Sequence, residues 1–141
     1  MIVLDTDCVS LLERDNEDAA VLRKRLTTAA PGEVVTTIIT FEEQMRGWLA
    51  FLAKARTLEK QIVAYSKLFR FLENYRVITV LPFESVAAIE FERLQKQKIR
   101  VGTMDLKIAS IALANNALLV TRNIADFEQV PNLQIADWTK P

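Results

Sequence analysis

The stretch IVLDTD, residues 2–7, decides the fold class of this chain. Residues 2–4 form a short apolar run rich in β-branched side chains, which predicts a buried strand. Polar and acidic side chains follow at once. A helix is expected from about Cys8, with Asp7 available as its N-cap. A buried strand that leads directly into a helix is typical of α/β proteins.

The rest of the chain repeats this alternation of strands and helices. Apolar, β-rich runs predict further strands at residues 34–39, 77–81, 117–121 and 134–136. Helices are expected at about 17–29, 40–53, 58–75 and 84–98, and again after residue 103, with 40–53 and 58–75 forming a helical hairpin. This pattern predicts a three-layer α/β sandwich, with a mostly parallel central sheet flanked by helices.

Length and composition limit the possible organisation. The chain has 141 residues with only 3 glycines and 4 prolines, so we expect a single domain over residues 1–141. Eighteen basic and eighteen acidic residues cancel, so no overall basic excess points to nucleic acid. The lone Cys8 indicates a reducing compartment. We find neither a signal peptide nor the roughly 20 apolar residues that cross a membrane, so a cytoplasmic location is expected.

Acidic residues gather where a parallel sheet places its functional crevice, at the carboxyl ends of the strands. Asp5, Glu42, Glu43 and Asp126 follow predicted strands, and Asp105 lies in the first turn of a predicted helix. Histidine is absent, which excludes serine–histidine and cysteine–histidine mechanisms. Carboxylates that converge require a cation, and oxygen ligands favour Mg²⁺ or Mn²⁺. Such a centre is suited to the cleavage of phosphodiesters.

Each acid also has a plain structural interpretation. Glu43 lies three residues after Thr40, as in a capping box. The helix dipole favours an acid at Asp105, and Asp126 could belong to a loop or a cap. Asp5 is harder to explain in this way, because a carboxylate at the end of a buried strand is unfavourable without partners.

Four segments resemble the PIN-domain family and, within it, the VapC toxins of toxin–antitoxin pairs. The most specific part is the pattern Thr-x-Asn-x-x-Asp-Phe at 121–127. The resemblance covers almost the whole chain and implies a PIN-like fold. The matching segments are VLDTD (3–7), TIITFEEQMRG (37–47), MDLKIASIALANN (104–116) and VTRNIADFEQVPNLQIADW (120–138).

The resemblance implies an acidic metal site that holds one or two Mg²⁺ or Mn²⁺ ions. Its residues would be Asp5, Glu43, Asp105 and Asp126, with Asp5 and Asp105 as the main ligands. Glu43 is preferred to its neighbour at position 42 because Gly47 follows at the family's usual offset. The resemblance also implies hydrolysis of RNA to 5′-phosphate and 3′-hydroxyl ends, a small antitoxin partner and a homodimer.

Four further residues are expected at the border of the site. Thr121 and Asn123 resemble polar residues that orient ligands or face the substrate, and Thr6 and Asp7 flank Asp5. Asp7 is a departure from the resemblance, because asparagine is common at this position in the family. The consequence of this extra charge stays open at the level of sequence.

The predicted hairpin combines basic and aromatic side chains. Its basic residues could hold the RNA backbone or form an ordinary solvated face. Its surplus of large apolar side chains could line a groove for the antitoxin, form a dimer surface or fill a larger core. The large apolar residues in question are Trp48, Phe51, Phe69, Phe71 and Leu72.

Two other functions stay open from the sequence. The DTDCV stretch at 5–9 resembles the opening motif of haloacid-dehalogenase-type phosphatases, in which Asp5 would be a nucleophile and Asp7 an acid–base. The chain is short for that fold, and Ser10 stands where a leucine is expected. The protein could also be an inactive PIN domain that binds RNA or a protein partner. Substrate class and metal binding separate these alternatives.

Overall fold

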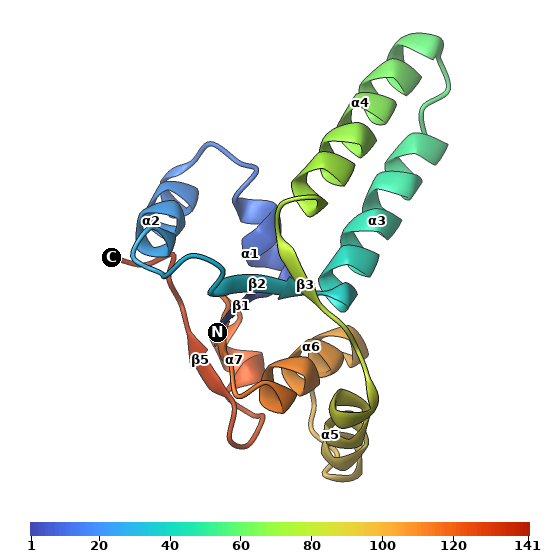
Figure 1. The fold of residues 1–141 in the computed structure, drawn as a ribbon. Helices are drawn as coiled ribbons and strands as arrows, with labels where there is room; N and C mark the ends of the chain where they lie inside the picture. The colour runs from blue at the N-terminus through green and yellow to red at the C-terminus, as the bar shows by residue number, and fades with distance from the viewer.

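The computed structural model describes residues 1–141 as a five-stranded sheet with helices on both faces (Figure 1). The strand order is β3-β2-β1-β4-β5 and every pair is parallel, so the expected three-layer sandwich is confirmed. In chain order, the elements are β1 (Ile2–Leu4), α1 (Thr6–Leu11), α2 (Glu17–Leu26), β2 (Val34–Thr37), α3 (Ile38–Ala53), α4 (Leu58–Tyr75), β3 (Thr79–Leu81), α5 (Ser85–Lys96), α6 (Thr103–Ala114), β4 (Leu118–Val120), α7 (Ile124–Phe127) and β5 (Gln134–Ala136).

The alternation of side chains along the strands divides the core between the two faces of the sheet. Val3 of β1 packs with Val35 and Leu119 in a cluster that includes α5 and α6. Its neighbours Ile2 and Leu4 belong to a second cluster, with α1 and α2. Because helices cover both faces, the strands read in the sequence as continuous apolar runs rather than alternating ones.

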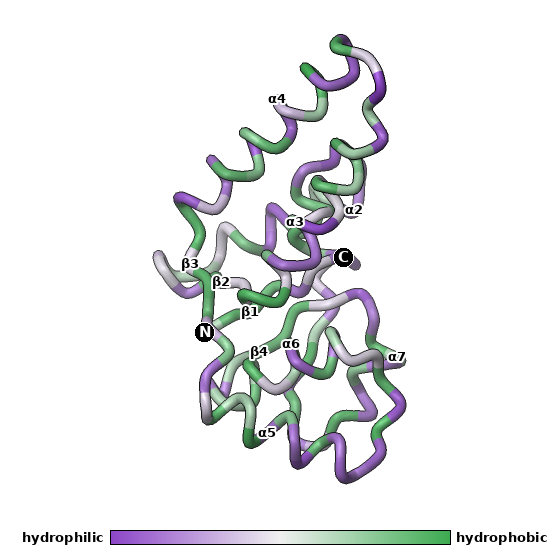
Figure 2. The backbone as a smooth tube through the Cα atoms, turned by 90° about the vertical axis from the view of Figure 1, so that its right-hand side faces the viewer, coloured by the Kyte–Doolittle hydropathy of each residue, from purple (hydrophilic) through white to green (hydrophobic).

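Helices α3 and α4 form the predicted hairpin, which projects beyond the sheet (Figure 1). At its base, Phe41 stacks on Phe71 with ring centroids 5.2 Å apart and meets the edge of Tyr75 at 5.0 Å. Hydrophobic positions recur along the whole length of α4 (Figure 2). Only Ala64 and Phe71 of α4 are buried, so most of the apolar side chains of this helix lie outside the core.

The start of α1 corrects one expectation. The helix begins at Thr6, and Asp5 is its N-cap, with a side chain that accepts a hydrogen bond from the backbone N–H of Cys8. Asp7 was expected to be the cap but lies inside the first turn. The short helix α7 was not expected, because four residues are too few to show a helical period.

The start of α3 corrects a second expectation. Strand β2 ends at Thr37, whose hydroxyl accepts a hydrogen bond from the backbone N–H of Thr40 and caps a helix that begins at Ile38. The capping box expected from Thr40 and Glu43 is therefore wrong. Glu43 lies in the second turn of α3, where its carboxylate is not needed as a cap.

The order of connections places a crevice between β1 and β4. From the central β1 the chain first moves to one side through β2 and β3, and it then crosses to the other side for β4 and β5. Ligands of parallel α/β proteins bind at such a reversal, outside the carboxyl ends of the strands. Asp5 follows β1 at this point and Thr121 follows β4. None of the helices combines the length and the apolar character needed to cross a bilayer.

Candidate active site

Asp5 is buried at the carboxyl end of β1, with 5% of its surface exposed. Its Oδ1 accepts a hydrogen bond from the Cys8 backbone N–H at 2.9 Å, and its Oδ2 accepts one from the Thr121 hydroxyl at 2.5 Å. Burial raises the pKa of Asp5, and the hydrogen bonds from Thr121 and Cys8 oppose that rise. The carboxyl group is thus both a helix cap and a fixed feature of the crevice.

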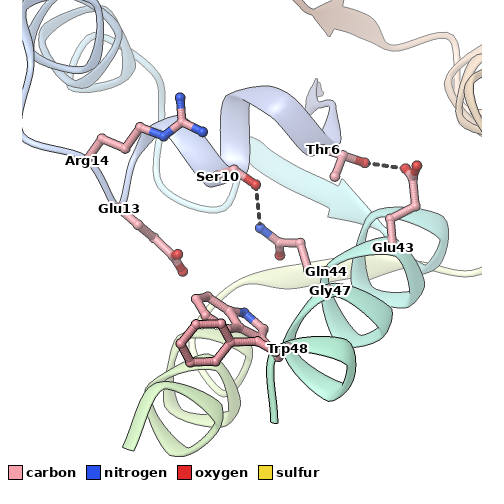
Figure 3. A pocket seen from close by; sticks show the side chains of 9 residues that line it. Thr6, Ser10, Glu13, Arg14, Glu43, Gln44, Gly47 and Trp48 are labelled. Carbon is pink, nitrogen blue, oxygen red and sulfur yellow. Dashed lines mark hydrogen bonds between the residues drawn. The ribbon is translucent and has the colours of Figure 1, made fainter. Parts of the chain in front are cut away.

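A row of threonine hydroxyl groups leads to Glu43. The Thr37 hydroxyl donates to that of Thr40 at 3.4 Å, the Thr40 and Thr6 hydroxyls lie 3.1 Å apart, and Thr6 donates to Glu43 Oε1 at 2.6 Å. An ionised carboxylate can only accept hydrogen bonds, so each hydroxyl in the row donates toward Glu43. Figure 3 shows the last of these bonds, between α1 and α3. Sequence reasoning gave Thr40 a capping role and missed this row.

Two neighbouring glutamates of α3 have different surroundings. Glu42 pairs with Arg46 one turn later, at 2.5 Å. Glu43 turns to Thr6 instead. Gly47 lines a groove beside Glu43, and a Cβ atom there would meet no atom within 4 Å. Its missing side chain keeps this part of the groove wide.

Asp105 is partly buried in the first turn of α6. Burial raises its pKa to about 6, and the negative charges of Glu43, Asp5 and Asp126 add to the rise. Neither a hydrogen bond nor a basic side chain opposes the shift. The other three predicted acids therefore lie close enough to act on Asp105, and the charge at Asp105 is not compensated.

Thr121 and Asn123 connect the acids that flank the crevice. The Thr121 hydroxyl donates to Asp5 and accepts a hydrogen bond from the Asn123 backbone N–H at 2.9 Å. The Asn123 side-chain amide donates to Asp126 Oδ2 at 2.9 Å. Both residues therefore lie in direct contact with acids of the crevice.

Asp7 is turned toward Arg122. The guanidinium of Arg122 donates from Nε to Asp7 Oδ2 at 2.7 Å and from Nη2 to Asp7 Oδ1 at 3.0 Å. These hydrogen bonds lower the pKa of Asp7 against the opposing effect of burial. Sequence reasoning missed Arg122, although its place between Thr121 and Asn123 was a signal.

The donor atoms fit a hard cation in type. Both oxygens of Asp105, Oε2 of Glu43 and Oδ1 of Asp126 accept no hydrogen bond. No three acidic side chains are gathered closely enough to hold an ion as they stand. Asp5, Glu43 and Asp126 each accept a hydrogen bond from a neighbouring donor. Carboxylate oxygens are the ligands that Mg²⁺ and Mn²⁺ prefer, so the donor atoms fit such an ion once the side chains approach one another more closely.

A groove of about 510 Å³ runs from Glu43 between α1 and α3 toward Trp48 (Figure 3). Gln44 spans it: its amide donates to the Ser10 hydroxyl at 3.1 Å, and its carbonyl accepts from the Tyr75 hydroxyl at 2.5 Å. The groove therefore has a polar end at the acids and an aromatic end. Its lining residues are Thr6, Ser10, Glu13, Arg14, Glu43, Gln44, Gly47, Trp48 and Phe51.

Comparison with known proteins identifies the fold family, because the PIN domain matches residues 2–133. The chain belongs to the PIN-domain family. A similar protein, Ribonuclease VapC1 of Haemophilus influenzae strain R2866, is 29% identical over 143 residues, which span 98% of each chain. The tRNA(fMet)-specific endonuclease VapC of Salmonella typhimurium is 32% identical over 65 residues, 43% of this chain and 47% of that protein.

A solved structure of VapBC-1 from nontypeable Haemophilus influenzae is similar to this PIN domain in three dimensions. The TM-score is 0.70 at 28% sequence identity, over 99% of this chain and 100% of the other. The fold expected from the four sequence segments is therefore confirmed.

Proposed function

We propose that the protein is a metal-dependent endoribonuclease, the toxin of a toxin–antitoxin pair, in which residues 1–141 act as one PIN domain. Family membership and the full-length likeness to a protein named a ribonuclease support RNA cleavage. The likeness to VapBC-1 supports the toxin–antitoxin role. The phosphatase alternative is not favoured, because the PIN domain accounts for residues 2–133.

One observation carries our assignment of the chemistry to the four acids. The pKa of Asp105 is raised to about 6 by burial and by the charges of Glu43, Asp5 and Asp126. The four side chains come from four separate parts of the chain, yet the other three act on the charge of Asp105. Such concentrated negative charge in a crevice is unfavourable for the fold, and shifted pKa values of this kind are typical of functional sites. A divalent cation relieves the repulsion, which supports a metal site over an inactive binding module.

Each acid is given a role from its surroundings. A bound Mg²⁺ or Mn²⁺ ion would lower the pKa of a water molecule and stabilise charge on the scissile phosphate. Asp5 is the rigid ligand, since two donors fix its carboxyl group, and Asp105 is the free one. Glu43 and Asp126 each keep one oxygen without a hydrogen bond and complete a site for one or two ions. Thr6 and Asn123 orient these two carboxylates.

The substrate we propose is RNA, cleaved by water at a phosphodiester. Water attacks phosphorus, and the bond to the 3′ oxygen breaks, leaving a 5′-phosphate and a 3′-hydroxyl. Arg14 lines the groove and offers a charge for phosphate. At the aromatic end, the Lys67 ammonium lies 5.8 Å from the centre of the Trp48 ring. An RNA substrate also agrees with the cytoplasmic location expected from the sequence.

We place the antitoxin contact in the groove between α1 and α3. A polypeptide in this groove would bury apolar side chains against Trp48 and Phe51, whose rings meet edge to face at 6.1 Å. Its other end would lie over Glu43 and cover the acids from RNA. Growth arrest on expression, relieved by the neighbouring gene, tests the toxin role. A Trp48→Ala variant that escapes this relief while still arresting growth supports the groove as the contact.

We propose that a homodimer forms along the outer face of α4. Leu58, Ile62, Tyr65, Phe69 and Leu72 are exposed there at alternating spacings of four and three, the pattern of a helix–helix seam. Light scattering after size exclusion should give a dimer for the wild type and a monomer for Phe69→Glu. A monomeric wild type at micromolar concentration would remove the dimer from the proposal.

Calorimetric titration with Mn²⁺ tests the metal site. Asp105→Asn is compared with Asp15→Asn, a matched change in an exposed loop. We expect Asp15→Asn to bind like the wild type and Asp105→Asn to bind at least about tenfold more weakly. Equal binding by all three proteins would place the ion elsewhere.

A further inference from the structure

Arg122 lies between the two residues that orient Asp5 and Asp126. Two of its guanidinium nitrogens bind Asp7 as a fork, and the third, Nη1, lies 3.2 Å from Asp18 Oδ2. All three nitrogens of the group are therefore engaged. Although Asp7 and Asp18 are about half exposed, the side chain of Arg122 is only 29% exposed.

These ion pairs join two parts of the fold across the crevice. Asp7 belongs to α1 and Asp18 to the first turn of α2, whereas Arg122 follows β4. A bidentate arginine–carboxylate pair fixes orientation as well as distance. The segment 121–123 is thereby tied to α1 and α2 at the point where it meets the acids.

We propose that Arg122 is a positioning residue of the metal site. Its fork on Asp7 holds segment 121–123 in the place from which Thr121 donates to Asp5 and Asn123 donates to Asp126. Because both oxygens of Asp7 accept hydrogen bonds from Arg122, neither is available as a metal ligand. This inference rests on the proposed metal site, and it explains how the chain accommodates a fifth acid beside the other four.

A positioning role and a simple charge effect predict opposite results. If Arg122 acted only through its positive charge, it would repel a divalent cation, and its removal would strengthen Mn²⁺ binding. If it positions the ligands, its removal should weaken binding, because loss of a group that orients ligands typically lowers metal affinity by about 10- to 100-fold. The sign of the change therefore decides between them.

The experiment is a calorimetric Mn²⁺ titration of Arg122→Met and Arg122→Lys. Arg93→Met is the control, because it removes an arginine–glutamate pair on α5, away from the crevice. We expect dissociation constants roughly tenfold higher for Arg122→Met, intermediate for Arg122→Lys and unchanged for Arg93→Met. Thermal melting in a chelator confirms that each variant is folded.

The double variant Asp7→Asn/Arg122→Met completes the test. If the pair acts as one unit, the double variant should bind Mn²⁺ within about twofold of Arg122→Met, because the pair is already broken. Recovery of wild-type affinity in the double variant, or tighter binding by Arg122→Met, would overturn the positioning role while leaving the metal site intact. If Asp105→Asn binds Mn²⁺ as tightly as the wild type does, the metal site is overturned and the positioning role with it.

Discussion

Replacing Asp105 with asparagine should stabilise the metal-free protein at neutral pH. The pKa of Asp105 rises from 3.8 to about 6 in the folded protein, so folding disfavours its ionised form. Below about pH 4 the carboxyl is protonated whether the chain is folded or not, and it brings no penalty. Between about pH 4 and pH 6 the unfolded chain ionises this carboxyl before the folded protein does, so the folded state loses stability over this range and loses no more above it. Asparagine cannot ionise and avoids the loss.

The size of the effect follows from the same shift. At about 1.4 kcal/mol per pKa unit, the difference between 3.8 and about 6 would correspond to roughly 3 kcal/mol in a fully buried site. Asp105 is only partly buried, so solvent screening reduces this, and we expect about 1 kcal/mol. For a chain of this length, that raises the melting temperature by roughly 3 °C.

The assay is thermal melting in a chelator between pH 4 and pH 8, with Asp15→Asn as the exposed control. The melting temperatures of wild type and Asp105→Asn should agree near pH 4 and diverge up to about pH 6. Adding Mn²⁺ should raise the melting temperature of the wild type above that of Asp105→Asn, because the ion stabilises only a protein that binds it. A melting difference that does not depend on pH, or a destabilised Asp105→Asn at pH 7.5, would refute the reasoning.

Three further predictions concern other side chains of the crevice and the core. Glu43→Gln should lower RNA cleavage at least about 100-fold while changing the melting temperature little. Thr37→Ala, which removes the cap of α3, should instead lower the free energy of unfolding by about 1 kcal/mol. A large loss of stability in Glu43→Gln would contradict the assignment of Glu43 to the chemistry and of Thr37 to the cap. Thr121→Val, which removes the donor to Asp5, should weaken Mn²⁺ binding by roughly tenfold in calorimetry, and unchanged binding would count against its orienting role. Phe127→Ala empties a fully buried position and should lower the free energy of unfolding by about 3 kcal/mol or more in urea titration, with a smaller loss meaning that the site collapses around the change.

Much of the fold was predictable because its strands are short, apolar and bounded by polar residues. Strands β1 and β5 lie where the sequence placed them, and the hairpin of α3 and α4 was expected to within a residue or two. Two errors fall at strand-to-helix junctions. Thr37 and Ile38 have strong strand propensity, yet the first caps α3 and the second begins it, because position relative to the cap outweighs local propensity.

The acids of the proposed site could be named from the sequence, and their hydrogen-bond partners could not. Position after a predicted strand or at a helix start marked several acids as candidates, and the resemblance to PIN domains selected Asp5, Glu43, Asp105 and Asp126 among them. The threonine row to Glu43 and the pairing of Arg122 with Asp7 join residues far apart in the chain. Such contacts depend on which strands neighbour each other in the sheet, and a single sequence does not encode that order in any local pattern.

The most direct test of the account is RNA cleavage by the purified protein with Mg²⁺ or Mn²⁺. The same reaction is run in a chelator and with Asp105→Asn purified in parallel, which controls for contaminating ribonucleases. The account predicts cleavage by the wild type that requires the metal, leaves 5′-phosphate ends and disappears in the folded variant. Equal cleavage by Asp105→Asn, or cleavage that persists in the chelator, would contradict it.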